Sequence, residues 1–188
     1  MSPLPARRNP FATERLDRLG YRDPATGEPL EPAGLDRLLD RLEALGGRAA
    51  IVGPEGSGKT ALLEALAPRL ARRGWRVRWS ASGPREARAL DEASFLLIDG
   101  AERLAHRGWR RLLAASGGAG GLLVTVHRPG PLPTLVDCAT SPELLATLMD
   151  ELAGGPAPDL PGSHELFVRH RGNLREALLE LYDRCAGR

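Results

Sequence analysis

Residues 53–60 read GPEGSGKT, and they stand between a short apolar run at residues 49–52 (AAIV) and a helical pattern that starts near residue 59. The eight residues match the pattern GxxxxGK[ST], in which glycines allow a tight loop whose peptide N–H groups turn inward. The following helix points its positive N-terminal end toward the same place. This loop, placed between a strand and a helix, predicts a binding site for the phosphates of a nucleotide.

The composition singles out the cation of this loop. Of the 26 Lys and Arg residues in the chain, only Lys59 is a lysine. Its ammonium is a compact charge on a slim side chain, whereas guanidinium is a wide planar fork, so a narrow loop accepts Lys and not Arg. We expect Lys59 to contact the β- and γ-phosphates and the Thr60 hydroxyl to bind Mg²⁺. The expected phosphate-binding residues are Gly53, Pro54, Glu55, Gly56, Ser57, Gly58, Lys59, Thr60 and Ala61.

Short apolar segments alternate with helical patterns through the middle of the chain. The strand candidates are residues 49–52, 75–79, 94–98, 122–126 and 134–136, and the helical patterns lie near residues 34–45, 59–73, 84–92 and 101–115. This alternation requires crossover connections and predicts a parallel sheet with helices on both faces. Pro68 lies inside one helical pattern, so we expect that helix to kink or end there.

The two ends of the chain differ from this middle part. Residues 1–31 are rich in Pro, Arg and turn residues and indicate an N-terminal arm, ahead of the α/β core at residues 32–140. Residues 141–188 are helical only. Ser141 begins one helix there, and Asn173 has capping-box spacing to Glu176 at the start of the last one. The expected buried stripe of that last helix is Leu174, Ala177, Leu178 and Leu181.

A second candidate site follows the apolar run FLLI at residues 95–98. Asp99 ends this strand 40 residues after Lys59, and its carboxylate would hold Mg²⁺ through water. Gly100 occupies the next position, where ATPases usually carry the catalytic Glu. Glu102 is the nearest acid. It either polarises the attacking water or is an ordinary acid in the first turn of the following helix.

The apolar run LLVTV at residues 122–126 is followed by His127 and Arg128. Polar side chains at the carboxyl end of a strand beside a phosphate loop lie at the crevice where open α/β sheets bind ligands. We therefore expect His127, ahead of Arg128, to contact the γ-phosphate, and His127 is the alternative to Glu102 for orienting water. The competing interpretation is that both are ordinary surface residues.

Together these motifs resemble a small P-loop ATPase of the AAA+ and STAND-like (ASCE) branch, over about residues 9–185. GPEGSGKT resembles its Walker A motif, FLLIDG its Walker B motif, LLVTVHRP its sensor strand and GNLREAL its C-terminal helical lid. The resemblance implies a three-layer P-loop NTPase fold with a five-stranded parallel sheet in the order 5-1-4-3-2. It also implies a short lid at residues 141–188, from which Arg175 would reach ATP. Residues 9–11 (NPF) resemble the segment that often borders the adenine pocket in bacterial secretion and transposition-helper ATPases.

Two groups of arginines are candidate partner surfaces. The first is Arg69, Arg72, Arg73, Arg76 and Arg78, and the second is Arg103, Arg107, Arg110 and Arg111, which would share one side of a helix over residues 101–115. In the implied strand order both groups lie toward the same edge, where they would bind nucleic acid or a protein, or donate an arginine finger. Acids interspersed among them favour a solvated face, and the net charge of +2 does not require nucleic acid.

These observations lead us to expect an ATP-binding protein and slow Mg²⁺-dependent ATPase that acts as a nucleotide-dependent switch. The alternatives are a nucleotide-gated interaction module with little turnover, which Gly100 favours, and a small-molecule or nucleoside kinase, which lacks an evident acceptor pocket. We expect an unidentified protein partner and ATP-dependent self-association. No apolar run approaches the roughly 18 residues of a spanning helix, which favours a cytoplasmic protein with no membrane partner. Cys138 and Cys185 are expected to be reduced thiols.

Overall fold

The computed structural model describes residues 8–80, 90–155 and 160–187. The chain divides into two compact units. The sheet unit consists of Leu30–Gly53 and Lys59–Cys138, and the helical unit consists of the described residues of Met1–Pro29, Pro54–Gly58 and Ala139–Arg188.

The sheet unit is an α/β unit built on one parallel sheet. Its strands are β1 (Arg48–Val52), β2 (Arg76–Ser80), β3 (Ser94–Ile98), β4 (Gly121–Val126) and β5 (Thr134–Asp137). The five strands are all parallel and lie in the order β2-β3-β4-β1-β5, which is the predicted order read from the opposite edge. Because β3, β4 and β1 are neighbours, the residues that follow their carboxyl ends meet at one edge of the sheet.

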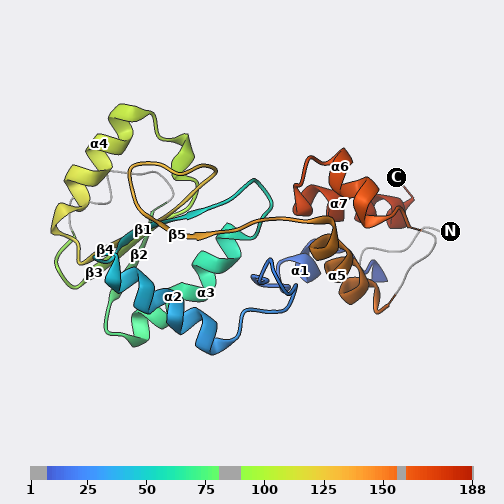
Figure 1. The fold of residues 1–188 in the computed structure, drawn as a ribbon, viewed down its shortest axis with the longest axis horizontal. Helices are drawn as coiled ribbons and strands as arrows, with labels where there is room; N and C mark the ends of the chain where they lie inside the picture. The colour runs from blue at the N-terminus through green and yellow to red at the C-terminus, as the bar shows by residue number, and fades with distance from the viewer. Residues whose placement is uncertain (1–7, 81–89, 156–159, 188) are drawn as a thin grey trace. The chain divides into compact units, whose positions relative to one another are not determined.

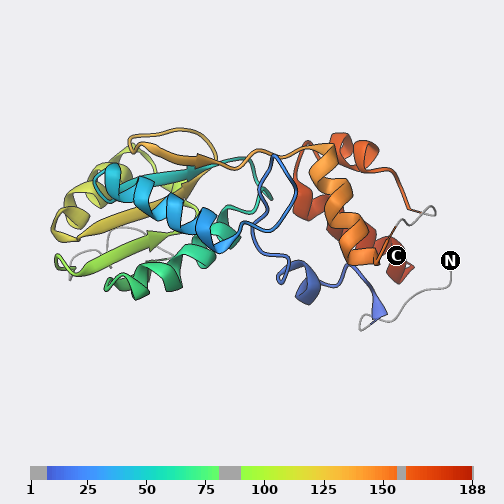
Figure 2. The ribbon, with the colours of Figure 1, turned by 60° about the horizontal axis from the view of Figure 1, so that its bottom comes forward.

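Helices cover both faces of this sheet, as the alternating pattern predicts. Figure 1 shows α4 (His106–Ala115) on one side and α2 (Pro32–Ala44) and α3 (Lys59–Arg72) on the other, and Figure 2 shows the same layers from another direction. Leu112 of α4 is fully buried against Leu96 of β3 and Leu122 of β4. These strands are buried throughout, because a parallel sheet with two covered faces has no solvated side.

The sequence predicted that helix α3 would either kink or end at Pro68. The helix does not end there. It continues to Arg72. Pro68 has no N–H to donate to the carbonyl of Glu64, but both residues are exposed, so water can bond that carbonyl. Leu66 and Leu70 are buried on the opposite side of the helix and hold its last turns in place.

The helix predicted at residues 101–115 begins only at His106. Gly100 has a left-handed φ of 76°, and it is followed by the 3-10 turn η3 (Ala101–Arg103) and two extended residues. Arg103 is therefore not part of α4, and the prediction of one shared helix side for all four arginines is wrong for it. The helix predicted near residues 84–92 lies largely outside the described residues, and residues 90–92 are not helical.

The helical unit contains α1 (Thr13–Leu16), α5 (Pro142–Ala153), α6 (Ser163–Arg169) and α7 (Leu174–Ala186). Both predicted caps are present: Ser141 Oγ accepts a hydrogen bond from Leu144 N at 3.1 Å, and Asn173 Oδ1 accepts one from Glu176 N at 3.1 Å. All four residues of the predicted stripe on α7 are buried. Phe11 is fully buried in the same core, and residues 8–29 of the predicted arm belong to this unit, whereas residues 30–31 belong to the sheet unit.

Glu180 of α7 lies among three cationic or basic side chains in the helical unit. Its Oε1 accepts a hydrogen bond from Arg184 Nε at 2.8 Å, its Oε2 lies 2.6 Å from His170 Nε2, and it also pairs with Arg169. Burial by itself raises the pKa of this carboxyl, but the bonds to His170 and Arg184 and the charge of Arg169 outweigh it. The pKa of Glu180 is therefore lowered from its ordinary value.

No helix in residues 8–80, 90–155 or 160–187 has both the length and the apolar character needed to cross a bilayer.

Candidate functional site

Lys59 is the first residue of α3 and is buried, with 8% of its surface exposed. Its Nζ donates a hydrogen bond to the carbonyl oxygen of Gly53, the residue that follows β1, at 2.8 Å. A buried ammonium needs such oxygen partners because it has lost its contact with bulk water. The lysine side chain thus folds back onto the start of its own loop.

Thr60 and Asp99 join two separate elements of the sheet unit. Asp99 follows β3, and its Oδ2 accepts a hydrogen bond from Thr60 Oγ1 of α3 at 2.9 Å. This contact brings the hydroxyl of the GKT triplet onto the carboxylate at the end of the FLLI strand, as their predicted shared role requires. Thr60 and Asp99 are 39 residues apart in the sequence.

Thr125 is a site residue that the sequence analysis did not select. Its hydroxyl, on β4, donates to Asp99 Oδ1 at 2.6 Å and accepts from the backbone N–H of Gly100 at 2.7 Å. Only 1% of Thr125 is exposed. The signal was present in the sequence, because Thr125 is the single polar residue in the buried run LLVTV and a buried hydroxyl needs partners.

Glu102 and His127 form a second contact between the same two strand ends. Glu102 Oε1, in η3, lies 3.5 Å from His127 Nε2, just after β4. The other carboxylate oxygen of Glu102 is buried, and within the described residues it has no hydrogen-bond partner. Two contacts, Thr125 with Asp99 and His127 with Glu102, therefore tie the end of β3 to the end of β4. We name this pair of contacts the β3–β4 clamp.

The loop residues Pro54–Gly58 belong to the helical unit. Gly56 and Gly58 have φ angles of 72° and 84°, which side chains other than Gly rarely adopt. A Cβ at Gly56 would stand 2.0 Å from Asn173 Oδ1, so only glycine fits against the cap of α7. Only 7% of Ser57 is exposed, and its hydroxyl has no hydrogen-bond partner among the described residues. A buried hydroxyl without a partner is unusual and marks a place where a ligand atom can bond.

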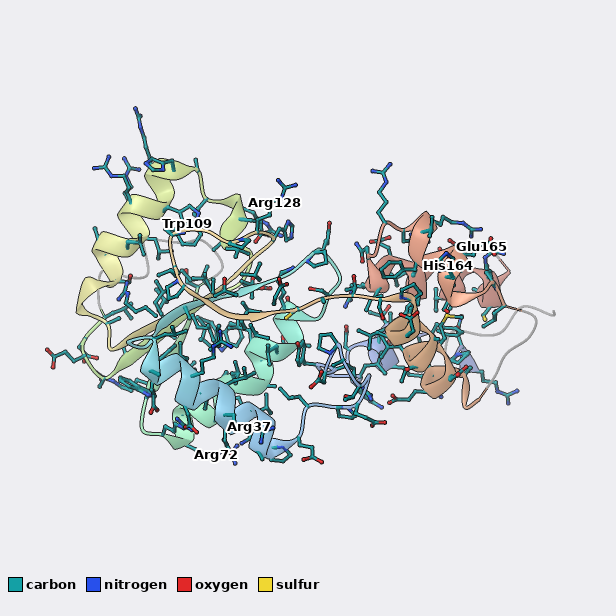
Figure 3. The ribbon with its side chains drawn as sticks, viewed as in Figure 1. Arg37, Arg72, Trp109, Arg128, His164 and Glu165 are labelled. Carbon is teal, nitrogen blue, oxygen red and sulfur yellow. The ribbon has the colours of Figure 1, made fainter. Side chains whose placement is uncertain are left out.

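The two predicted arginine contacts lie in different units. Arg128 of the sheet unit is exposed after β4 (Figure 3). Arg175 belongs to the helical unit, where its Nη1 donates to Asp17 Oδ1 at 3.1 Å and both side chains are half exposed. Five other predicted residues of the sheet unit, by contrast, gather at the carboxyl ends of its strands. They are Lys59, Thr60, Asp99, Glu102 and His127.

The donor set at this edge fits a magnesium ion with phosphate. Mg²⁺ prefers hard oxygen ligands and binds proteins through one or two of them plus substrate phosphates. Thr60 and Asp99 offer a hydroxyl and a carboxylate that are already in contact, and Lys59 supplies a cation from the same stretch of chain.

No protein-family model matches the chain, and a search of curated proteins also finds no match.

Proposed function

We propose that the chain is an ATP-binding protein of the P-loop class and a slow Mg²⁺-dependent ATPase that acts as a nucleotide-dependent switch. The observation that carries the proposal is the 2.9 Å hydrogen bond from Thr60 to Asp99. It joins the GPEGSGKT loop to the FLLIDG segment, the two stretches that carry the Walker A and Walker B resemblances. The buried position of Lys59 beside Thr60 supports the same assignment.

The phosphate-binding roles fall to the loop. Lys59 and the loop N–H groups would neutralise the triphosphate, and the orphan hydroxyl of Ser57 would donate to one of its oxygens. Thr60 and Asp99 would hold Mg²⁺, which when bound neutralises the charge that develops on the phosphates. Arg128 and, by the resemblance, Arg175 would respond to the γ-phosphate.

Hydrolysis would use the β3–β4 clamp. A water oxygen attacks the γ-phosphorus while the bond from that phosphorus to the β–γ bridging oxygen breaks, which yields ADP and phosphate. The unpartnered carboxylate oxygen of Glu102 would accept the proton of that water, and His127, at 3.5 Å, would orient the carboxylate. The nucleotide state would be transmitted to an unidentified protein partner or to a second copy of the chain.

A second candidate function is a nucleotide-gated interaction module with little turnover. Gly100 favours it, because the position that usually bears the catalytic acid has a φ of 76°, at which a Glu side chain is strained. Replacing Glu102 with Gln separates the two candidates. The ATPase predicts that Glu102→Gln loses turnover and keeps ATP affinity, whereas equal phosphate release by both proteins would favour the interaction module.

The presence of a single lysine allows a direct test of the ATP site. An amine-acylating reagent can modify only Lys59 and the N-terminal amine, and mass spectrometry separates the two products. We expect Mg-ATP to slow acylation of Lys59 while leaving the N-terminal amine unaffected, which makes that amine an internal control. Equal acylation of Lys59 with and without a saturating nucleotide would contradict the proposal.

Affinity measurements complete the test. We expect Lys59→Ala to weaken ATP binding about thirtyfold or more, because a lost charged contact to phosphate costs on the order of 2 kcal/mol. Asp99→Asn should weaken binding only when Mg²⁺ is present. Arg72→Ala, an exposed substitution further along α3, is the matched control. If Lys59→Ala keeps ATP affinity within a factor of about two while its thermal unfolding is unchanged, the site is wrongly assigned.

A further inference from the structure

The two arginine groups singled out in the sequence have different surroundings in the sheet unit. In the first group, Arg69 pairs with Asp36 at 2.6 Å, and Arg73 pairs with Asp40 at 2.6 Å and Glu43 at 2.7 Å. Arg73 donates hydrogen bonds to the carboxylates of Glu43 and Asp40, and these bonds raise the pKa of its guanidinium. The acids of α2 therefore neutralise Arg69 and Arg73, and Asp91 neutralises Arg76.

The second group has no such neutralisation by any residue that the structure describes. Arg107, Arg110 and Arg111 of α4 are exposed, and none makes a hydrogen bond or ion pair with another residue in the part of the chain that the structure describes. Helix α4 (HRGWRRLLAA) contains no acid. Of the acids expected to intersperse these arginines, Asp91 pairs with Arg76, Glu102 lies against His127, and Glu92 is exposed without an ion pair to a described residue, while Glu86 lies outside the described residues. We name Arg107, Arg110 and Arg111 the α4 arginine face.

This face offers charge without an apolar centre. Trp109 and Leu112 point the other way and pack on the sheet, with Leu112 fully buried. Among the described residues, the large apolar side chains that are exposed are Trp79 and Val168, and neither belongs to α4. Protein–protein interfaces usually contain a buried apolar or aromatic centre, whereas binding to a phosphate backbone is mainly electrostatic. The composition of the face therefore fits a polyphosphate better than a protein.

We propose that the α4 arginine face binds the phosphate backbone of double-stranded DNA without regard to sequence. A guanidinium group can donate two hydrogen bonds to one phosphate. Duplex DNA carries closely spaced phosphates, which three unpaired arginines can contact. Unpaired bases are recognised by stacking on exposed aromatic side chains, and the aromatic residue of α4, Trp109, is partly buried against the core of the sheet unit. This function is independent of the proposed ATP site.

The salt dependence of binding is the quantity that tests this proposal. Each arginine–phosphate contact contributes about −0.9 to the slope of log affinity against log salt concentration. The three arginines thus contribute about −2.7, so a fourfold rise in salt should weaken binding about forty-fold. The experiment measures the fluorescence anisotropy of a labelled DNA duplex of random sequence, with the full chain, over a series of salt concentrations.

A matched pair of variants separates this face from the general charge of the protein. Arg110→Ala with Arg111→Ala should lower the slope by about 1.8. Arg37→Ala with Arg72→Ala removes the same charge from exposed positions on α2 and α3, across the sheet from Trp109 (Figure 3), and should leave the slope unchanged. Thermal unfolding of each variant confirms that the fold is kept.

Four results would overturn the proposal. An unchanged slope in the α4 variant would show that DNA does not contact this face. An equal reduction of the slope in both double variants would show that only the net charge of the protein determines binding. Displacement of DNA by poly-glutamate as effectively, charge for charge, as by unlabelled duplex would identify an acidic protein as the partner. Tighter binding to single-stranded than to duplex DNA would also reject the duplex.

Discussion

Replacing Thr125 with Val removes the hydroxyl at the centre of the β3–β4 clamp while keeping the shape of the side chain. The wild-type hydroxyl donates to Asp99 Oδ1 at 2.6 Å and accepts from Gly100 N at 2.7 Å. A hydrogen bond to a charged group contributes about 1.5–3 kcal/mol and a neutral one about 0.5–1.5 kcal/mol. Only 1% of Thr125 is exposed, so water does not replace the lost hydroxyl as a partner of Asp99 and Gly100. We expect Thr125→Val to reduce the free energy of unfolding by about 2–4 kcal/mol.

Urea unfolding, followed by circular dichroism without nucleotide, measures this change. Thr125→Ser keeps the hydroxyl and removes one methyl group, so it should cost only about 0.5–1.5 kcal/mol, as buried methyl deletions usually do. The order wild type, Ser, Val therefore separates the hydrogen bonds from packing. A Val variant within about 0.5 kcal/mol of wild type, or a Ser variant as unstable as the Val variant, would refute the reasoning.

Three further predictions concern the helical unit and the thiols. Gly56→Ala should be clearly more destabilising than Gly20→Ala: both have positive φ, but only at Gly56 would a Cβ meet a neighbour, at 2.0 Å, and unfolding curves compare the two. Glu180→Gln should cost about 1–2 kcal/mol above pH 5. Because the folded pKa of Glu180 is lowered, its stabilisation is present above the unfolded pKa and is lost as pH falls through the folded value, so wild-type and Gln curves should converge in acid. Cys138 and Cys185 are buried, and burial raises the pKa of Cys185, so neither thiol should react with a disulfide reagent until urea unfolds the protein; prompt reaction of either would contradict this.

The order of elements was open to prediction because its signals are local. Alternation of apolar runs with helical patterns gave the parallel sheet, and the positions of Ser141 and Asn173 marked two helix starts that the structure confirms. A local pattern failed where it depended on a single residue. Gly100 turns the chain into the left-handed region, so the helix expected from residue 101 starts five residues later at His106.

The sequence by itself determined the parallel sheet, the capped helices and a glycine-rich loop with one lysine, because periodicity, caps and turn residues act between near neighbours. Only the tertiary structure decided that Thr125 holds Asp99, that Glu102 meets His127, and that acids of α2 pair with Arg69 and Arg73 while the α4 arginine face has no partner among the described residues. Each of these contacts joins residues from different elements. Their distances depend on strand register and helix placement, which no local pattern of residues specifies.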